Sequence, residues 1–359
     1  MIDTKYLQLV LAIDRCGSLG KASKELNLTT SALSHQLRNL ESNLGIKLFH
    51  RAGNQLLFTE AGLELKERAG GILSELDDLQ AKMVEIQADQ DRRYVHGYSQ
   101  REAQRLHDQA ATVAEYLHYD SIWEDGAHIL EVGCGVGAQT EIIAAQNPTC
   151  TFTSIDISGE SIARAKKRLQ ERDVGNVQLE ELDVYELPKR KICYDHIFVC
   201  FLLEHVRNPG EVLEVLYRVL KSGGTITVIE GDHGSTFFHP DDPYARKLVR
   251  GQVTLQEQRG GDANIGRKLY PLLASAEFTD IQVSPRQIYV DRSRGALVQG
   301  FIEDTFTAMI AGMGTAMITE GLVTKEELER GLAGLRRTEE ADGVFSYTFF
   351  KGKGSKPLG

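Results

Sequence analysis

The stretch ILEVGCGVGAQTEII, residues 129–143, constrains the fold of this chain more than any other segment. An apolar run at 129–132 breaks on three alternate glycines and then resumes with a helical pattern. This order predicts a strand, a tight turn and a helix. Glycines in such a turn let the backbone approach a ligand and let the helix pack against the strand. By itself, the turn is also compatible with several kinds of nucleotide-binding loop, or with a corner that holds no ligand.

The sequence after the turn alternates between strand and helix patterns. Apolar strand candidates occur at 150–158 and in VQLEELDV, YDHIFVC and TITVIEGD, with helical stretches between them. Two later strands are predicted at 278–290 and 343–352, separated by a helical insertion at about 292–342. Alternating strands and helices with right-handed crossovers predict a doubly wound α/β, Rossmann-like parallel sheet of seven strands. Such a sheet binds its ligand at the carboxyl ends of the strands.

Two acidic residues are predicted to lie at that edge of the sheet. Asp156 ends the second strand, nineteen residues after Gly137. A carboxylate at this place can accept hydrogen bonds from both ribose hydroxyls of an adenosine. Asp183 ends the third strand, where its side chain and the amide of Val184 can contact an adenine edge. The pattern is typical of a site for an adenosine-containing ligand.

Four features in one order resemble the class I S-adenosylmethionine-dependent methyltransferases: E-x-G-x-G-x-G, the acidic end of the second strand, LDV and LKSGG. The resemblance covers about residues 94–290. NAD-binding dehydrogenases, the natural competitor, more often carry G-x-G-x-x-G. The resemblance implies S-adenosylmethionine as cofactor. The cofactor contacts that it implies are Tyr98, Glu131, Gly133, Gly135, Gly137, Asp156, Ile157, Asp183, Val184, Cys200 and Phe201.

The methyl acceptor is expected to meet side chains that follow the fourth and fifth strands. Alignment of nucleophile and methyl group does most of the work in methyl transfer, and a general base is optional. The candidates for such a base are Asp232, His233 and His205. The segment at 239–247 reads as a lid, in which Arg246 could meet an anionic acceptor. No set of His, Cys and Asp has metal-ligand spacing, so no metal is predicted.

The helical insertion resembles the substrate caps of small-molecule methyltransferases, which implies a small-molecule acceptor. The sequence after the fourth strand lacks the proline motifs of DNA methyltransferases, which argues against DNA as the acceptor. The apolar side chains of the insertion either line a substrate pocket or form an ordinary helical core. They are Phe301, Phe306, Met309, Met313 and Met317.

The first 59 residues predict two short helices joined by a tight turn, followed by a hairpin. The second helix, TSALSHQLRNLESNLG, carries an inward leucine stripe, and Ser18 is predicted to cap the helix before it. Such a second helix can enter the major groove of DNA. A plain helical bundle with a solvated polar face is the alternative on spacing alone.

The segment GSLGKASKELNLTTSALSHQLRNLESNLGIKLFHRAGNQLLFTEAG resembles the DNA-binding domain of LysR-type transcriptional regulators. Within that family it is most similar to the regulators of methionine biosynthesis. The resemblance implies an all-α winged helix-turn-helix that binds DNA. The residues expected to face DNA are Ser18, Thr30, Ser31, Ser34, His35, Arg38 and, on the wing, Arg51.

Residues 60–90 read as one long helix whose apolar residues alternate spacings of four and three. Such a heptad seam predicts a two-stranded coiled coil, and the alternative is a helix lying on its own domain. LysR-type proteins dimerise through this linker helix, so the resemblance also implies a homodimer. The seam consists of Leu65, Ala69, Ile72, Leu76, Leu79, Met83 and Ile86.

The distribution of charge along the chain supports the assignment of DNA binding to the N-terminal segment. The chain carries a net charge of −10, yet residues 1–59 hold seven cations against four anions, which makes them +3 and the remainder −13. Only the N-terminal segment is therefore a plausible partner for phosphate. No apolar run approaches the length of a membrane span, no signal peptide is found, and the five cysteines lack C-x-x-C spacing. A cytoplasmic protein with no membrane partner and with reduced thiols is expected.

The sequence thus predicts a DNA-binding domain at 1–59, a dimerisation helix at 60–90 and a methyltransferase domain at 91–359. The first hypothesis is an enzyme that methylates a small molecule and also binds DNA. The second is a transcriptional regulator whose methyltransferase-like domain senses S-adenosylmethionine or S-adenosylhomocysteine without transferring a methyl group. The third is an N-terminal module that serves only for dimerisation, which would fit its modest positive charge.

Overall fold

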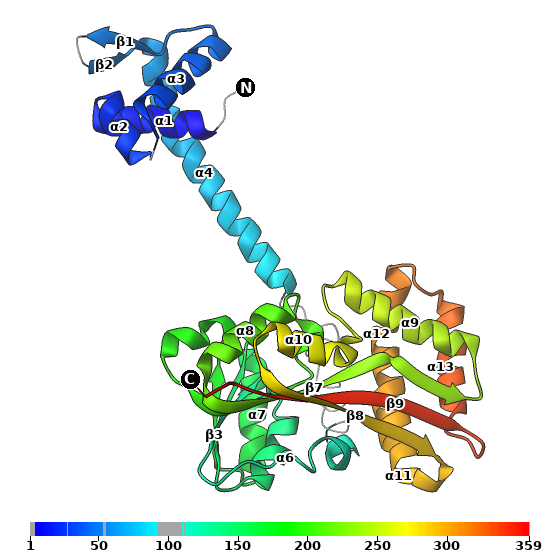
Figure 1. The fold of residues 1–359 in the computed structure, drawn as a ribbon. Coiled ribbons are helices and arrows are strands. Elements are labelled where there is room, and N and C mark those ends of the chain that lie inside the picture. The colour runs from blue at the N-terminus through cyan, green and yellow to red at the C-terminus, as the bar shows by residue number, and fades with distance from the viewer. Residues whose placement is uncertain (1–3, 27, 53–54, 92–109, 111, 359) are drawn as a thin grey trace. The chain divides into compact units, whose positions relative to one another are not determined.

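A computed structural model describes residues 4–26, 28–52, 55–91, 110 and 112–358. The chain divides into two compact units, Met1–Gln90 and Asp91–Gly359, and each is described by itself (Figure 1). Tyr98, one of the implied cofactor contacts, lies outside the described residues.

The N-terminal unit is a helix-turn-helix with a two-stranded wing. Its core gathers the apolar faces of the first three helices and includes the inward leucines of α3, whose spacing follows the helical period. Thr29 begins α3, because its Oγ1 accepts a hydrogen bond from the amide of Ala32 at 3.1 Å. The antiparallel wing strands pair Phe49 with Phe58. The elements are α1 (Thr4–Cys16), α2 (Leu19–Glu25), α3 (Thr30–Leu44), β1 (Phe49–Ala52), β2 (Gln55–Phe58) and α4 (Glu60–Asp91).

A buried carboxylate joins α3 to the wing. Glu41 accepts hydrogen bonds from the amides of Leu48 and Phe49 at 2.9 and 3.3 Å, and Lys47 Nζ lies 2.7 Å from its other oxygen. Burial acts to raise the pKa of Glu41, but Lys47 and the two amides outweigh it and the pKa is lowered. The charged form of Glu41 therefore holds the start of the wing against the recognition helix.

Helix α4 begins inside the N-terminal unit and then extends beyond its core. Leu65 packs against that core and Ala69 is fully buried, but the next residue of the apolar seam, Ile72, is 42% exposed. A single chain leaves this part of the seam uncovered. Among the described helices, none combines the length and apolar character that a membrane crossing requires.

The second unit is built on a seven-stranded sheet in the order β5-β4-β3-β6-β7-β9-β8. All its neighbouring pairs are parallel except those of β9, which runs antiparallel to both β7 and β8. The prediction of a parallel sheet is therefore wrong for the last strand. The chain enters β9 from the helical insertion, at the end of the sheet opposite to that where the other strands begin. The strands are β3 (His128–Val132), β4 (Thr151–Asp156), β5 (Val177–Glu181), β6 (Tyr194–Cys200), β7 (Leu220–His239), β8 (Thr279–Asp291) and β9 (Val344–Ser355).

Helices cover both faces of this sheet and bury two separate apolar layers (Figure 1). One layer includes α8 (Pro209–Val219) and α10 (Leu269–Ser275), and the other includes α6 (Ala138–Gln146) and α9 (Pro243–Gln258). Successive residues of β3 alternate between the layers, since Ile129 joins one and Leu130 the other. The crossover helix α7 (Gly159–Glu171) lies between β4 and β5 in the chain.

The helical insertion before β9 forms a cap together with α9. It contains α11 (Gly295–Leu297), the π-helix η5 (Val298–Thr307), α12 (Ala308–Thr319) and α13 (Lys325–Arg337). All five apolar side chains singled out in the sequence, from Phe301 to Met317, are buried in the core that joins the cap to the sheet.

The segment predicted to be a lid is part of the folded body. β7 runs on to His239, α9 begins at Pro243, and Ala245 on its inner face is fully buried. Arg246 forms an ion pair with Asp241, so it is not held ready for an anionic acceptor. The apolar face of this segment is why it folds down as helix instead of remaining a loop.

A buried ion cluster holds the start of the second unit against β8 and β9. Asp120 accepts hydrogen bonds from Lys351 Nζ at 2.6 Å and from Arg286 Nη2 at 2.7 Å. Lys351 is fully buried and also donates to the Leu117 carbonyl and Ser121 Oγ, at 3.0 and 2.8 Å. Burial raises the pKa of Asp120, but the two cations outweigh it and hold this pKa well below its usual range.

Candidate active site and DNA-binding surface

The turn between β3 and α6 carries three glycines in the left-handed region. The φ angles of Gly133, Gly135 and Gly137 are +75°, +52° and +77°. A Cβ at Gly133 would lie 2.9 Å from Leu202 Cδ1, and one at Gly137 would lie 3.0 Å from Ala165 Cβ. At Gly135 a Cβ would meet no atom of the described residues within 4 Å. Packing therefore requires two of the glycines, whereas the third borders open space at the carboxyl end of β3.

Asp156, at the end of β4, is tied to this turn. Its two carboxylate oxygens accept hydrogen bonds from the amides of Gly135 and Ser158, each at 2.9 Å. Burial raises the pKa of Asp156. Each oxygen keeps a lone pair for a further donor, because a carboxylate has about four acceptor positions. The next residue, Ile157, is apolar and 40% exposed.

Glu131 and Asp183 lie at neighbouring parts of the same edge. The Glu131 carboxyl is buried, accepts a hydrogen bond from Ser154 Oγ at 2.6 Å, and has its pKa raised to about 7 by burial. Asp183 follows β5 and accepts a hydrogen bond from the Tyr185 amide at 3.0 Å, which starts the 3-10 turn that includes Val184.

The end of β6 completes the edge. Cys200 is buried, and Phe201 adopts a left-handed backbone with φ +57° while its amide donates to the Ile229 carbonyl at 2.9 Å. A bulky residue in this region costs about 1–2 kcal/mol, and such strain collects at ligand sites. Because β5, β4, β3 and β6 are consecutive in the sheet, their carboxyl ends bring all the described candidate cofactor contacts to one edge.

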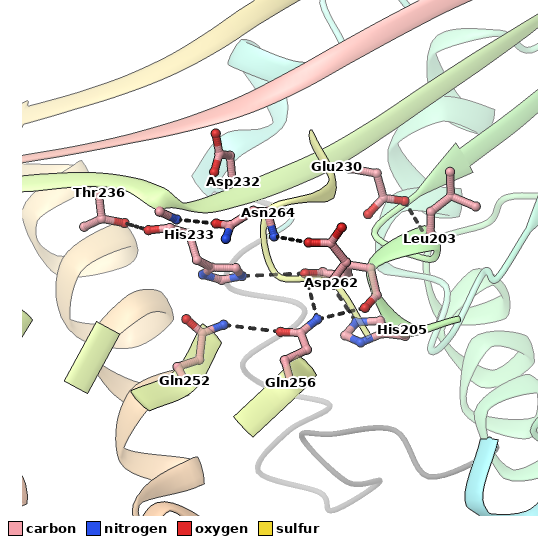
Figure 2. A network of polar contacts seen from close by, with 12 residues as sticks. Leu203, His205, Glu230, Asp232, His233, Thr236, Gln252, Gln256, Asp262 and Asn264 are labelled. Atoms are coloured by element: carbon pink, nitrogen blue, oxygen red, sulfur yellow. Dashed lines mark hydrogen bonds and ion pairs between the residues drawn. The ribbon is translucent and has the colours of Figure 1, made fainter. Parts of the chain in front are cut away.

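A network of buried polar side chains follows β6 and β7 (Figure 2). Glu230 is fully buried and accepts hydrogen bonds from the amides of Leu202 and Leu203 at 3.0 and 2.7 Å. Burial, and then the nearby charge of Glu204, raise the pKa of Glu230 well above its usual range. Through these two hydrogen bonds, Glu230 supports the turn after β6.

The three candidates for a general base have different surroundings. Asp232 accepts a bidentate pair of hydrogen bonds from Arg267, at 3.0 and 2.6 Å, and forms an ion pair with it. The imidazole Nε2 atoms of His205 and His233 face the two oxygens of Glu204, at 3.4 and 3.6 Å. Asp232 pairs with Thr348 of β9, whereas His233 begins an irregular stretch of β7 that ends where Phe237 pairs with Ser346.

The polar residues predicted to face DNA lie on the outer side of α3. Thr30, Ser31, His35 and Arg38 are exposed, and Ser34 is partly exposed. Arg38 Nε donates to the carbonyl of Ser34 at 3.2 Å, which leaves the other nitrogens of its guanidinium for a ligand.

Ser18 and Arg51 are the two other residues that were predicted to contact DNA. Ser18 is the N-cap residue of α2, as predicted, and its backbone is extended, but its side chain makes no capping hydrogen bond. Its hydroxyl therefore remains available for another partner. Arg51 lies on wing strand β1.

Two family models match separate parts of the chain. Residues 4–63 match the bacterial regulatory helix-turn-helix protein, lysR family, and residues 130–226 match a methyltransferase domain. The chain joins a LysR-type helix-turn-helix domain to a methyltransferase domain. The first match covers α1 to the start of α4, and the second covers β3 to β7, including the glycine turn.

Relatives of the LysR–methyltransferase chain match it to different extents. An uncharacterized 37.1 kDa protein in a transposon of Streptomyces fradiae is 28% identical over 82% of both chains, a share larger than the methyltransferase unit alone. The regulator MetR of Escherichia coli is 43% identical over 21% of this chain and 24% of its own length. A solved phosphoethanolamine N-methyltransferase of Haemonchus contortus is 14% identical over 69% of this chain and 52% of that chain, with a TM-score of 0.42. The chain thus spans only about a quarter of MetR and half of the Haemonchus enzyme.

Several residues of the methyltransferase site carry no sequence signal that reveals them. Glu204 and Glu230 are 26 positions apart, and Gln252 and Gln256 come from α9, yet hydrogen bonds and ion pairs link all of them to His233 or to its strand. The i, i+4 spacing of the two glutamines places them on one face of α9, and this is the one local signal that could have paired them. No group of three or more potential metal ligands occurs among residues whose placement is described.

Proposed function

We propose that the methyltransferase domain binds S-adenosylmethionine at the carboxyl edge of its sheet and transfers the methyl group to a small molecule. The LysR-type domain, in this proposal, binds DNA as a homodimer. The observation that carries the enzymatic part is the glycine turn, in which Gly135 borders open space while its amide is held by Asp156.

The residues at this edge fit such a cofactor. The space beside Gly135 admits a ligand against bare backbone, and Asp156 keeps acceptor capacity for the ribose hydroxyls. The buried Glu131 carboxyl, whose pKa is about 7, is suited to receive the ammonium group of the methionine part, since a nearby cation favours its ionised form. Ile157 offers an exposed apolar surface, and Asp183 with Val184 offers a polar edge for the base.

When bound, the cofactor supplies an electrophilic methyl group on a sulfonium. The protein's own part is to hold that group in line with the acceptor, which is where most of the rate enhancement of such a displacement arises. Phe201 and Cys200, at the end of β6, are the residues proposed to lie along the sulfonium. The strained backbone of Phe201 is stabilised there by its hydrogen bond to Ile229.

The Asp156→Ala variant tests the cofactor site. We expect its dissociation constant for S-adenosylmethionine, measured by calorimetry, to rise about tenfold to a hundredfold, because hydrogen bonds to a charged group contribute about 1.5–3 kcal/mol. Asp195→Ala is the matched control, since Asp195 also accepts from an amide, that of His128, but near the opposite end of the strands. Equal affinity of Asp156→Ala and the native protein would remove this site.

The DNA-binding part rests on the exposed polar face of α3. We expect Arg38→Ala to bind a duplex of the protein's own upstream DNA more weakly, with a salt slope shallower by about 0.9 for one lost phosphate contact. Arg68→Ala on α4 is the control, because Arg68 is engaged with Glu64. An unchanged titration curve for Arg38→Ala would show that α3 does not read the DNA.

The proposal of a dimer rests on helix α4, because the apolar seam of this helix is exposed at Ile72 in the single chain. A second copy of the helix would bury this seam in a coiled coil. The resulting dimer would present two DNA-binding domains to a two-fold symmetric DNA site.

One contact favours the regulator as a second candidate function. His118 Nε2 lies 2.6 Å from Gln139 Oε1, and Ala110 packs with Val136 and Ala138, so the chain entering the methyltransferase unit touches the glycine turn and α6. A ligand that shifts the turn could therefore act on the position of His118 through Gln139. Fluorescence anisotropy on the same DNA, with and without S-adenosylmethionine and S-adenosylhomocysteine, separates the two: ligand-dependent affinity indicates a sensor.

A further inference from the structure

Three buried polar atoms on the cap and on β7 have no hydrogen-bond partner among the described residues. They are His233 Nδ1, Gln252 Oε1 and Thr307 Oγ1, and their residues are 6%, 0% and 3% exposed. They come from β7, α9 and η5. A buried polar atom left unsatisfied costs about 1–3 kcal/mol, so each such atom in a folded protein calls for an explanation. A bound ligand that supplies the missing partners is one.

A chain of contacts places His233 and Gln252 in one network (Figure 2). The Glu204 Oε2 atom lies 3.6 Å from His233 Nε2 and 3.4 Å from Gln256 Nε2. Gln256 Oε1 in turn accepts a hydrogen bond from Gln252 Nε2 at 3.4 Å. In Figure 2 the Gln252 side chain lies beneath the His233 ring.

The directions of these contacts determine what the free atoms can do. A carboxylate opposite Nε2 keeps the proton on that nitrogen, so His233 Nδ1 presents a lone pair. Gln252 uses its amide nitrogen toward Gln256, so its free Oε1 is also an acceptor. Both atoms therefore require a ligand that donates hydrogen bonds.

The surroundings of His233 are apolar and aromatic. Its ring centroid lies 5.4 Å from that of Tyr347 and 6.4 Å from that of Phe306. Tyr347 continues to Phe349 at 4.7 Å, and Phe349 to Phe201 at 5.4 Å. This series of rings connects His233 with the end of β6, where the proposed sulfonium lies.

The charges at this site do not favour a ligand that carries a carboxylate or a phosphate. The buried cations of the described chain are Lys351 and Arg286, and both are bound to Asp120. Arg267, on the polar network, is bound to Asp232. A carboxylate or phosphate acceptor would find no buried cation to offset its desolvation.

We propose that His233 is the general base of methyl transfer and that the acceptor is a neutral hydroxyl compound with an apolar body. This rests on the proposed function. The hydroxyl oxygen forms a bond to the methyl carbon while the carbon–sulfur bond of S-adenosylmethionine breaks and S-adenosylhomocysteine leaves. The hydroxyl proton passes to His233 Nδ1, and the Glu204 carboxylate stabilises the resulting imidazolium, while Gln252 Oε1 accepts from a second donor of the acceptor molecule. A hydroxyl fits better than a neutral amine, because an amine attacks without prior loss of a proton.

The cap beside His233 combines an unusual helix with close packing between helices. Phe306 and Thr307 belong to a ten-residue π-helix, a rare element that is found mostly at functional sites. Gly251 on α9 lies so close to α12 that a Cβ there would be 3.0 Å from Met317 Sδ. The π-helix and α9 thus hold the apolar wall of the site against the sheet.

The test compares His233→Gln with His239→Gln, the same chemical change at an exposed position of the same strand. The probes are para-cresol and para-nitrophenol, compared at a mildly alkaline pH at which para-cresol is un-ionised and para-nitrophenol is largely ionised. Methyl ether formed from S-adenosylmethionine is measured by mass spectrometry. For His233→Gln we expect kcat/KM with para-cresol to fall by about a hundredfold to ten-thousandfold, and with para-nitrophenol much less, because an ionised acceptor needs no base.

The possible outcomes separate the two proposals. Equal losses with both phenols would show that His233 is only structural, and an unaffected variant would show that it has no role. If the native protein binds S-adenosylmethionine by calorimetry but methylates neither phenol, the hydroxyl acceptor is overturned while the cofactor site stands. If it does not bind S-adenosylmethionine, the proposed enzymatic function itself fails.

Discussion

The Gly135→Val substitution is expected to abolish S-adenosylmethionine binding while the methyltransferase unit remains folded. A Cβ at this position meets no atom of the part of the chain that the structure describes within 4 Å, so the valine side chain is expected to enter the space in which the cofactor is proposed to lie. The left-handed φ of +52° adds a cost of about 1–2 kcal/mol to folding, which a domain of ordinary stability tolerates. Affinity should fall on the order of a hundredfold or more, or about 2.7 kcal/mol.

The matched substitution Gly137→Val is expected to act mainly on stability, whereas Gly135→Val acts mainly on cofactor binding. Its Cβ would lie 3.0 Å from Cβ and 3.1 Å from Cα of Ala165, so the backbone of α7 would have to move. We expect a loss of about 2–5 kcal/mol in the free energy of unfolding, from left-handed strain and overpacking together. Calorimetry measures binding in both variants, and fluorescence of the single tryptophan, Trp123, measures folding. Native affinity in Gly135→Val would show that the turn does not hold the cofactor.

The Asp120→Asn substitution is expected to give the largest loss of stability. It leaves Lys351 fully buried, and Arg286 nearly so, without the carboxylate that both now contact. Breaking a buried ion pair from one side costs about 3–5 kcal/mol, which lowers the melting temperature of the methyltransferase unit on the order of 10 °C. The double variant Asp120→Asn with Lys351→Met should recover part of this, because it removes the stranded charge.

The pH dependence of this effect follows from the lowered pKa of Asp120. Because the folded-state pKa lies below that of an unfolded aspartate, about 4, the stabilisation is complete above that pH and is lost as the pH falls further. The stability difference between the native protein and Asp120→Asn should therefore shrink below about pH 4.

Trp123 reports on this unit specifically, since its ring packs against Phe152 and Phe198 at 6.0 and 5.9 Å. Glu115→Gln, the same kind of change at an exposed position of the same segment, is the control. If Asp120→Asn and Glu115→Gln both have the melting temperature of the native protein, the ion cluster around Asp120 contributes no stability.

Local patterns made much of the architecture predictable. The strand–turn–helix around Gly133 and the leucine stripe of α3 are encoded within about 15 neighbouring residues, where the two-residue and 3.6-residue periods apply. The outward position of Arg38 and the placement of Asp156 at a strand end follow from the same periods. The helical insertion before the last strand could be predicted for a similar reason, because capping and amphipathic spacing mark its helices.

The parts that were missed depend on contacts between distant segments. Asp120 and Lys351 are 231 positions apart, and no local period relates them. The ion pair between Asp232 and Arg267 likewise joins two separate elements, and the segment predicted to be a lid continues from the end of β7 into helix α9, whose inner face is buried. Long-range pairing of polar groups is decided by the packed fold, which a single sequence does not display.

The position of β9 determines the order in which the protein can assemble. It is the last strand in the chain, yet it lies inside the sheet, where it separates β7 from β8. On the ribosome, the LysR-type domain emerges first and can fold at once, since domains generally fold as units. The seven-stranded sheet of the second unit cannot be completed at that time. The edges of β7 and β8 that pair with β9 stay unpaired until residues 344–355 have left the exit tunnel. A nascent chain could therefore engage DNA before its methyltransferase unit exists.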